Sequence, residues 1–371
     1  MMEMPEFQAL YTQVLWAAFA VAFVFGVITQ KTHFCTMGAI SDVVNMGDWT
    51  RARQWAMAVG VAMVLFFAMA SAGLIDPLQT FYTSSRVIWL SALVGGALFG
   101  LGMVLGSGCG SKTLVRIGSG NLKSLVVFVV MGLAAFATLR GITGVLRTQT
   151  VDTVTFEMDT SSSVALWLSS QWGWSLTGAF VIALVVGLAL VLWALLSADF
   201  RSHHNNWLGG LGVGLAVAAL WWVTGHMAFV EEHPQTLESV YVTTNSGLIE
   251  SFTFIAPVSY VIDWLIFYSD ASKVLTLGVV SVAGVIAGAF VYSVATRTFH
   301  WEGFRNTQDT ALHLVGAVLM GVGGVTAMGC TVGQGLSGLS TLSVTSMIAV
   351  VGIVLGALLG FKFQMWLLER E

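Results

Sequence analysis

Three cysteines carry the side chains best suited to chemistry, and each lies in a motif rich in small or hydroxyl-bearing residues. Cys35 stands in HFCTMG, Cys109 in GSGCGSKT and Cys330 in GCTVGQGLSG. A thiol is a weak hydrogen-bond donor, whereas a thiolate is a nucleophile and a metal ligand. No CxxC pair occurs, and three widely spaced cysteines give no disulfide framework. The motifs leave open weak ligand binding, covalent sulfur chemistry and simple packing of small apolar side chains.

The glycines beside the cysteines favour close approach of the backbone to a permeant molecule. They also leave backbone N–H groups free where a short helix begins, and such N-termini suit anions. The second motif superficially resembles a phosphate-binding loop, but Ser111 rather than glycine precedes Lys112. This departure from the pattern excludes nucleotide binding.

The composition shows what must position these motifs. The 371 residues include fifteen basic and nineteen acidic ones, so only 9% are charged, while 56% are hydrophobic. Soluble domains carry about 25% charged residues. A soluble enzyme is therefore excluded, and the net charge of −4 is too weak to indicate nucleic-acid binding. The sequence predicts an all-α polytopic membrane protein in contact with the lipid bilayer.

Apolar runs of spanning length predict nine transmembrane helices. They cover 10–29, 54–73, 87–106, 122–140, 173–196, 207–225, 274–296, 310–328 and 346–368. Four further segments are too apolar for solvated loops and too short or broken to span, which is typical of re-entrant half-helices. These segments are 33–46, 107–119, 250–268 and 330–342. The first span is not a cleavable signal peptide, because no basic start or cleavage site accompanies it.

The distribution of Lys and Arg predicts the orientation. With the N-terminus outside and nine spans, eleven basic residues fall inside and four fall outside. This bias obeys the positive-inside rule. It places the C-terminus in the cytosol. Counting 250–268 as a tenth span would weaken the bias, so we favour nine spans.

An internal repeat links two parts of the chain. Residues 97–109 read ALFGLGMVLGSGC and residues 318–330 read VLMGVGGVTAMGC, so three glycines and the cysteine coincide. The pattern predicts a single transport domain with two inverted halves, 10–140 and 207–368, separated by the span at 173–196. Inverted repeats with broken helices are a common transporter plan.

The cysteine motifs and the repeated glycines resemble the YeeE/YedE family of bacterial sulfur-compound transporters, most specifically at GCTVGQGLSGLS, residues 329–340. The resemblance implies thiosulfate import across the inner membrane by an hourglass-shaped protein. It also implies that Cys35, Cys109 and Cys330 line a central path at successive depths, and that a soluble TusA-like sulfur carrier is the cytosolic partner. Two polar insertions, 141–172 and 226–249, depart from the family pattern and leave selenium compounds open as substrates.

A neutral thiol suits a path that must release its anion, because conduction needs weak sites in series. The ordinary pKa of a thiol, about 8.5, keeps it protonated at neutral pH. We expect further path residues beside the cysteines, although each could instead cap its own half-helix. They are Gly108, Gly110, Ser111, Gly329, Thr331, Gly333, Gln334 and Ser337. Lys112, Arg116 and His33 are expected to attract the anion, with positive-inside anchoring or a structural role as the alternative.

Two other functions remain open. A membrane enzyme could relay sulfur through cysteine persulfides, which needs a thiolate with an adjacent base. Only Cys35 has a nearby histidine in sequence, so we favour transport and expect no catalytic residue, metal or cofactor. A channel for another small anion is the second alternative. The sequence does not distinguish a channel from a carrier and identifies no coupling ion or oligomeric state.

Overall fold

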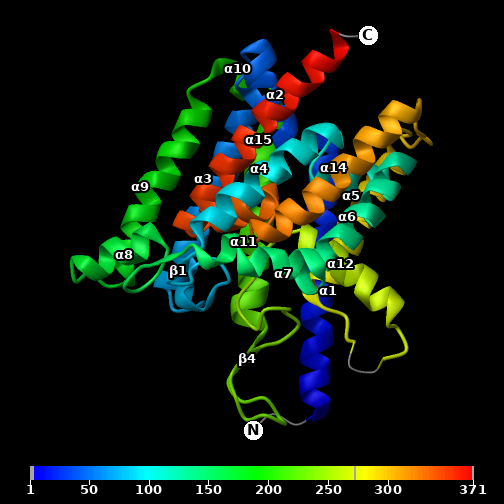
Figure 1. Cartoon of the computed structure of the whole chain (residues 1–371). Helices are drawn as coiled ribbons and strands as arrows, with labels where there is room; N and C mark the ends of the chain where they lie inside the picture. The colour runs from blue at the N-terminus through cyan, green and yellow to red at the C-terminus, as the bar shows by residue number, and fades with distance from the viewer. Residues whose placement is uncertain (1–3, 271–272, 370–371) are drawn as a thin grey trace.

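The computed structural model describes residues 4–270 and 273–369, and these residues are mostly helical (Figure 1). Within them, nine helical segments are long and apolar enough to cross a membrane. They are Met4–Met46, Thr50–Ser71, Trp89–Gly118, Leu122–Arg140, Leu176–Leu195, His204–Met227, Leu277–Ala295, Thr307–Thr326 and Val344–Leu367. The predicted all-α polytopic class and the nine spans are therefore confirmed for the described part of the chain.

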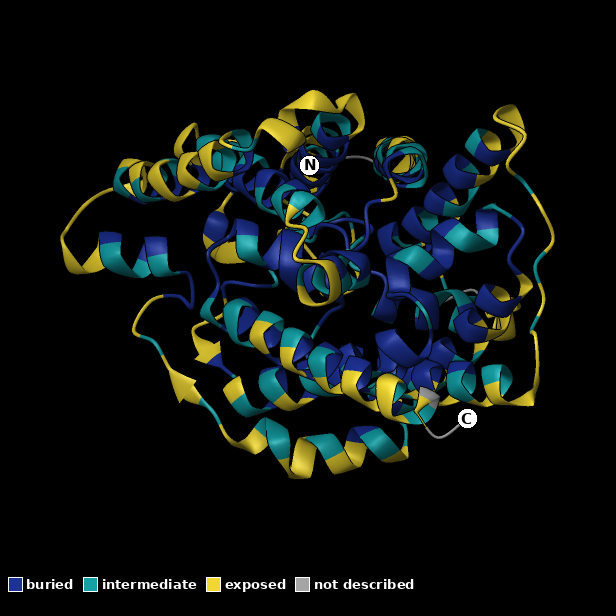
Figure 2. Cartoon of the chain, turned by 90° about the horizontal axis from the view of Figure 1, so that it is seen from above, coloured by how far each residue is buried: buried dark blue, intermediate teal, exposed yellow. Residues whose placement is uncertain are grey.

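The long helices follow the predicted spans, with ends shifted by a few residues. Their bounds are α1 Met4–Thr32, α3 Thr50–Ser71, α4 Trp89–Leu105, α6 Leu122–Arg140, α9 Leu176–Leu195, α11 His204–Trp222, α13 Leu277–Ala295, α14 Thr307–Thr326 and α15 Val344–Leu368. Large apolar side chains on their outer faces are exposed, among them Trp16 at 67%, Val185 at 64% and Leu359 at 60%. Figure 2 shows exposed residues around the rim and buried ones at the centre. Such a surface suits lipid rather than water.

Short helices occupy the four segments predicted to re-enter the membrane. They are α2 (Thr36–Ser41, extended by a π-helical turn over Asp42–Met46), α5 (Gly110–Gly118), α12 (Ile255–Ile266) and the helical residues 331–340, which include a π-helix over Gly333–Gly338. Residues 250–254 have no regular secondary structure. The 250–268 segment is thus too short a helix to span, as the choice of nine spans requires. Re-entry itself stays a prediction.

The two polar insertions are folded. Residues 141–172 contain α7 (Ile142–Gln149), a 3-10 turn (Val151–Thr153), β2 (Phe156–Glu157) and α8 (Val164–Gln171). β2 pairs antiparallel with β1 (Arg86–Val87), and β3 (Phe229–Val230) pairs antiparallel with β4 (Val240–Tyr241) in the second insertion. The short α10 (Ala198–Ser202) precedes α11. Figure 1 shows β4 near the N-terminal end of α1, while the C-terminal end of α15 lies at the opposite end of the molecule.

The repeated helices α4 and α14 pack antiparallel through their glycines. A Cβ atom at Gly102 would lie 2.7 Å from Gly316 O, and one at Gly323 would lie 2.7 Å from Gly95 O. Close backbone approach of this kind is how membrane helices associate without a hydrophobic driving force between them. Because the two helices run in opposite directions, the cysteines that follow them emerge at different levels of the molecule.

Replacing Gly102 with valine should destabilise the protein by about 1–3 kcal/mol, because the added atoms meet backbone of α14 that cannot move aside cheaply. Thermal unfolding of the detergent-solubilised protein measures this effect. Gly303→Ala is the control, since nothing lies within 4 Å of a Cβ atom there. Equal melting temperatures for the two variants would contradict the glycine-packed interface.

Candidate functional site

Each cysteine follows the same backbone break. The residue two positions before each cysteine has a left-handed conformation, which ends the preceding helix and turns the chain sharply. These residues are His33, Ser107 and Met328, with φ angles of 52°, 58° and 57°. Left-handed residues other than glycine are uncommon. Three such residues at equivalent positions indicate that the same turn presents each thiol to the start of the next short helix.

The cysteine side chains lie at these helix starts and are buried. The Gly38 N–H donates to Cys35 Sγ at 3.4 Å, and the Gly333 N–H donates to Cys330 Sγ at 3.4 Å. Cys109 is the residue before α5, and its Sγ lies 3.3 Å from Ser111 Oγ. Each sulfur that accepts a hydrogen bond from a backbone amide keeps its own S–H proton free to donate elsewhere.

The structure brings Cys35, Cys109 and Thr331 together. The Cys35 and Cys109 side chains interact directly, and the Thr331 side chain also interacts with Cys109. The Thr331 hydroxyl is buried beside Cys109 but makes no hydrogen bond of good geometry within the described residues. Cys330 lies within electrostatic range of Cys109 and Tyr82 and contacts the backbone of Phe254. Two thiols and one hydroxyl therefore converge at one point, with the third thiol beyond it.

Basic residues lie near Cys35 and Cys109. Lys112 interacts electrostatically with both thiols, and neither Lys112 nor Arg116 forms a salt bridge within the described residues. Arg116 Nη1 instead donates to Ser107 O at 2.7 Å, which holds the break before Cys109. His33 is exposed and lies within electrostatic range of Lys112. Of the three residues expected to attract an anion, Lys112 lies closest to the thiols.

The four path residues with polar side chains divide into two groups. Ser111 and Thr331 face the thiols, as described above. Gln334 and Ser337 bond to the protein: Gln334 Nε2 donates to Ala327 O at 2.6 Å, and Ser337 Oγ donates to Phe252 O at 2.8 Å. Ser346 also donates to Gln334 Oε1. Gln334 therefore ties the end of α14 to α15, and its part in a path stays a prediction.

A cavity of about 250 Å³, whose mostly apolar wall also carries several polar side chains, reaches Gly329, the residue before Cys330, from the end of the molecule that carries the insertions. Its wall includes Gly329, Tyr82, Thr253, Tyr260 and Glu250. A Cβ atom at Gly333 would lie 2.7 Å from Thr253 Oγ1 and 3.2 Å from Tyr82 Oη, so glycine is needed there. The cavity therefore brings hydroxyl groups against the helix start that follows Cys330. We call it the vestibule.

Gly329 is the one residue of the vestibule wall that the sequence indicated as a path residue. Tyr82, Glu250 and Thr253 lie in the connections between spans, far apart in sequence and in no recognisable motif. The only signal was the unusual apolar character of the 250–268 segment. Its irregular start, residues 250–254, carries Glu250 and Thr253 into the wall of the cavity.

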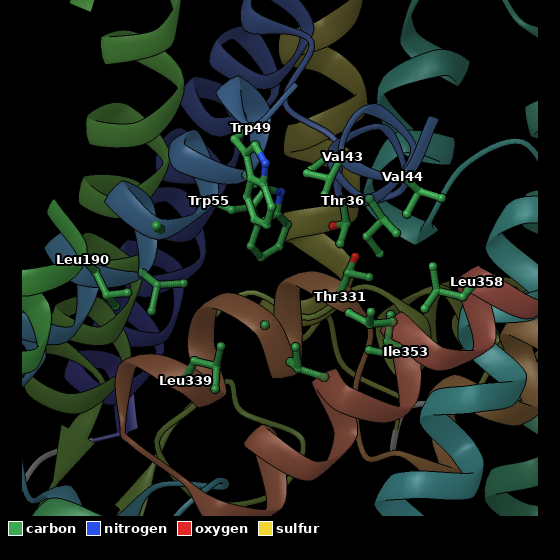
Figure 3. Close-up of a pocket in the computed structure, with 18 residues that line it drawn as sticks. Thr36, Val43, Val44, Trp49, Trp55, Leu190, Thr331, Leu339, Ile353 and Leu358 are labelled. Atoms are coloured by element: carbon green, nitrogen blue, oxygen red, sulfur yellow. The ribbon is translucent and has the colours of Figure 1, made fainter. Parts of the chain in front are cut away.

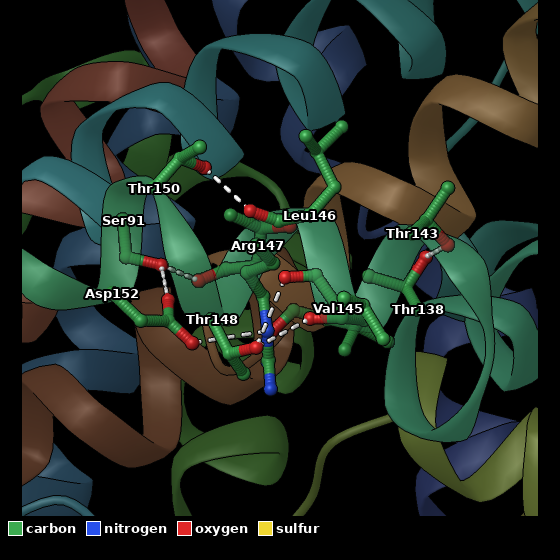
Figure 4. Close-up of polar contacts among 12 residues, drawn as sticks. Ser91, Thr138, Thr143, Val145, Leu146, Arg147, Thr148, Thr150 and Asp152 are labelled. Atoms are coloured by element: carbon green, nitrogen blue, oxygen red, sulfur yellow. Dashed lines mark hydrogen bonds and ion pairs between the residues drawn. The ribbon is translucent and has the colours of Figure 1, made fainter.

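The first insertion supplies a cation to the vestibule. Arg147 of α7 lines the cavity, and its Nε lies 3.1 Å from Asp152 Oδ2 (Figure 4). Ser91 of α4 donates to Asp152 Oδ1 at 2.6 Å and also to Thr326 O at 2.8 Å, at the end of α14. This chain of bonds fixes α7 against both repeated helices. The insertion thus holds a guanidinium group in the wall of the cavity.

A second pocket, of about 510 Å³, opens between α3, α9 and α15 (Figure 3). Its walls are apolar and include Trp49, Trp55 and Leu190, while Thr36 and Thr331 reach it from the cysteine cluster. An unpaired dianion would lose its hydration in such a pocket without compensation. The pocket is therefore unsuited to an anion, although it is larger than the vestibule. In the described part of the chain, no group of three or more His, Cys, Asp or Glu side chains could hold a metal ion.

Comparison with known proteins places the chain among sulfur transporters. Residues 31–359 match the model of a family described as sulphur transport. The thiosulfate transporter TsuA of Spirochaeta thermophila is 24% identical over 349 residues, which cover 92% of this chain and 97% of the relative. The thiosulfate transporter TsuA of Escherichia coli is 24% identical over 342 residues, which cover 89% of each protein.

Proposed function

Because this chain belongs to the sulphur transport family, we propose that it imports thiosulfate across the bacterial inner membrane. Two relatives of nearly equal length are thiosulfate transporters by name. The observation that carries the proposal is the convergence of Cys35, Cys109 and the buried Thr331 hydroxyl between the vestibule and Lys112. Uptake of labelled thiosulfate into vesicles that contain the protein tests it.

The anion moves along weak sites in series. It enters the vestibule, whose wall contains Arg147 paired with Asp152, and the Tyr82 and Thr253 hydroxyls there donate hydrogen bonds in place of water. Cys330 then passes it to Cys109 and Cys35, whose neutral S–H groups donate without holding it tightly. An arriving dianion opposes deprotonation of the thiols, because a thiolate would repel it. Lys112 draws the anion past the last two thiols.

Transport without covalent chemistry fits this arrangement better than a persulfide relay. A relay needs a base beside each reacting thiol. The groups that interact with Cys109 are Cys35, Ser111, Thr331 and Lys112, and within the described residues no histidine or carboxylate is among them. Detection of a persulfide on any cysteine after exposure to thiosulfate would favour the relay. Selenium compounds and other small anions are distinguished from thiosulfate by competition during uptake.

The proposal includes an orientation, two inverted halves and a partner. The N-terminus and both insertions lie outside, and the C-terminus lies in the cytosol, where a TusA-like sulfur carrier accepts the product. The charge bias of the sequence supports this orientation. The antiparallel packing of α4 against α14 supports the inversion of 10–140 relative to 207–368.

A reporter fused after Glu371 should be active only in the cytosol, because nine spans place the two ends on opposite sides of the membrane. A pair of reporters that fluoresce or hydrolyse only on one side measures this directly. A fusion in the connection after Arg140 serves as the control and should report the outer side. Activity of the Glu371 fusion outside the cell would contradict the proposed orientation.

A further inference from the structure

A carboxylate in the vestibule of an anion importer is chemically unexpected. Glu250 lines the cavity that leads to Gly329, and no salt bridge within the described residues includes it. One carboxylate oxygen accepts a hydrogen bond from the Ser246 N–H at 2.9 Å, which fixes the side chain. As an anion, Glu250 would repel thiosulfate at the point where the substrate leaves water.

The surroundings of Glu250 make protonation feasible. Tyr260 of α12 and Tyr82 both lie within electrostatic range of Glu250. Arg147 of α7 lines the same cavity but is paired with Asp152. Arg140, at the end of α6, acts on Tyr260. Glu250 lies outside the nine candidate spans, and burial raises the pKa of its carboxyl group above the ordinary value. Hydrogen bonds from the Ser246 and Asn245 amides oppose this change without cancelling it.

On the basis of the proposed function, we propose that Glu250 is a proton-binding site that controls admission of thiosulfate to the vestibule. The neutral carboxyl admits the dianion, and the carboxylate repels it. Binding is reciprocal: a dianion in the vestibule favours protonation of Glu250, so the anion and a proton enter the cavity together. Because the carboxyl is neutral below its raised pKa, affinity for thiosulfate increases as the external pH falls.

The initial rate of thiosulfate uptake into liposomes, at substrate concentrations well below saturation and with fixed internal pH, tests this proposal. Thiosulfate stays a dianion from mildly acidic to mildly alkaline pH, so the pH dependence reports the protein. Uptake by the natural protein should rise about tenfold between the alkaline and acidic limits, the change that one pKa unit of linkage produces. Glu250→Gln should be fast and nearly independent of pH, since Gln still accepts the Ser246 N–H.

Glu238→Gln is the matched control, because Glu238 is an exposed carboxylate in the same outer segment; its profile should follow that of the natural protein. Glu250→Met replaces the test variant if Glu250→Gln does not fold. Uptake by the natural protein that does not change with pH overturns the proposal without any variant, as does an unaltered pH profile in Glu250→Gln. Complete absence of thiosulfate uptake would instead contradict the transport function.

Discussion

Replacing Cys109 with alanine should reduce thiosulfate uptake by roughly tenfold to a hundredfold. Cys109 interacts with Cys35, Ser111 and Thr331, so alanine leaves an apolar gap where a donor is needed. Loss of a hydrogen bond to a charged group costs about 1.5–3 kcal/mol. Uptake of labelled thiosulfate by cells with matched protein levels measures the effect. Cys35→Ala and Cys330→Ala should also impair uptake.

Two variants separate donation from packing at Cys109. Serine should restore uptake only in part, because it donates well but is smaller and holds water more readily. Thr113→Ala is the control, since Thr113 is buried in the same short helix and donates to Cys109 O at 3.1 Å. Its uptake should stay near the natural level. If Cys35→Ala, Cys109→Ala and Cys330→Ala all take up thiosulfate at the natural rate with normal expression, the cysteines are packing residues.

Replacing Lys112 with methionine should raise the thiosulfate concentration needed for half-maximal uptake by about tenfold or more. Lys112 interacts with both Cys35 and Cys109, and it has no salt-bridge partner within the described residues. A charged donor that contacts an anion contributes about 1.5–3 kcal/mol. Uptake measured over a range of thiosulfate concentrations, at two ionic strengths, gives the change.

Lys362→Met is the matched control, because Lys362 is an exposed cation on α15. Only Lys112→Met should lose affinity. If both variants transport as the natural protein does, Lys112 acts in positive-inside anchoring and not on the substrate. Arg116 is unsuitable for this comparison, since its guanidinium group donates to Ser107 O and supports the break before Cys109.

The sequence predicted the spans because uninterrupted apolar runs leave few alternatives in a membrane. It also placed the three breaks, where glycine and cysteine follow a long apolar run. It did not predict the turn itself: the left-handed residues are His33, Ser107 and Met328 rather than the neighbouring glycines. Local spacing cannot show which residue of a short break adopts that conformation.

The sequence could not predict which residues from distant parts of the chain lie side by side in the folded protein. Glu250, Tyr82 and Arg147 come from three separate connections and line one cavity only because α7 and the irregular 250–254 segment fold over the helix ends. The 141–172 insertion was expected to be a polar departure from the family pattern. Its anchoring through Asp152 and Ser91 shows how an insertion can position a side chain in the vestibule.

Thiosulfate import by this protein is tested most simply by uptake into liposomes that contain the purified protein and no other transporter. We predict saturable uptake that unlabelled thiosulfate abolishes and that Cys109→Ala reduces by tenfold or more, as the cost of one lost charged hydrogen bond requires. If liposomes with the natural protein take up no more thiosulfate than empty liposomes, the protein does not transport thiosulfate.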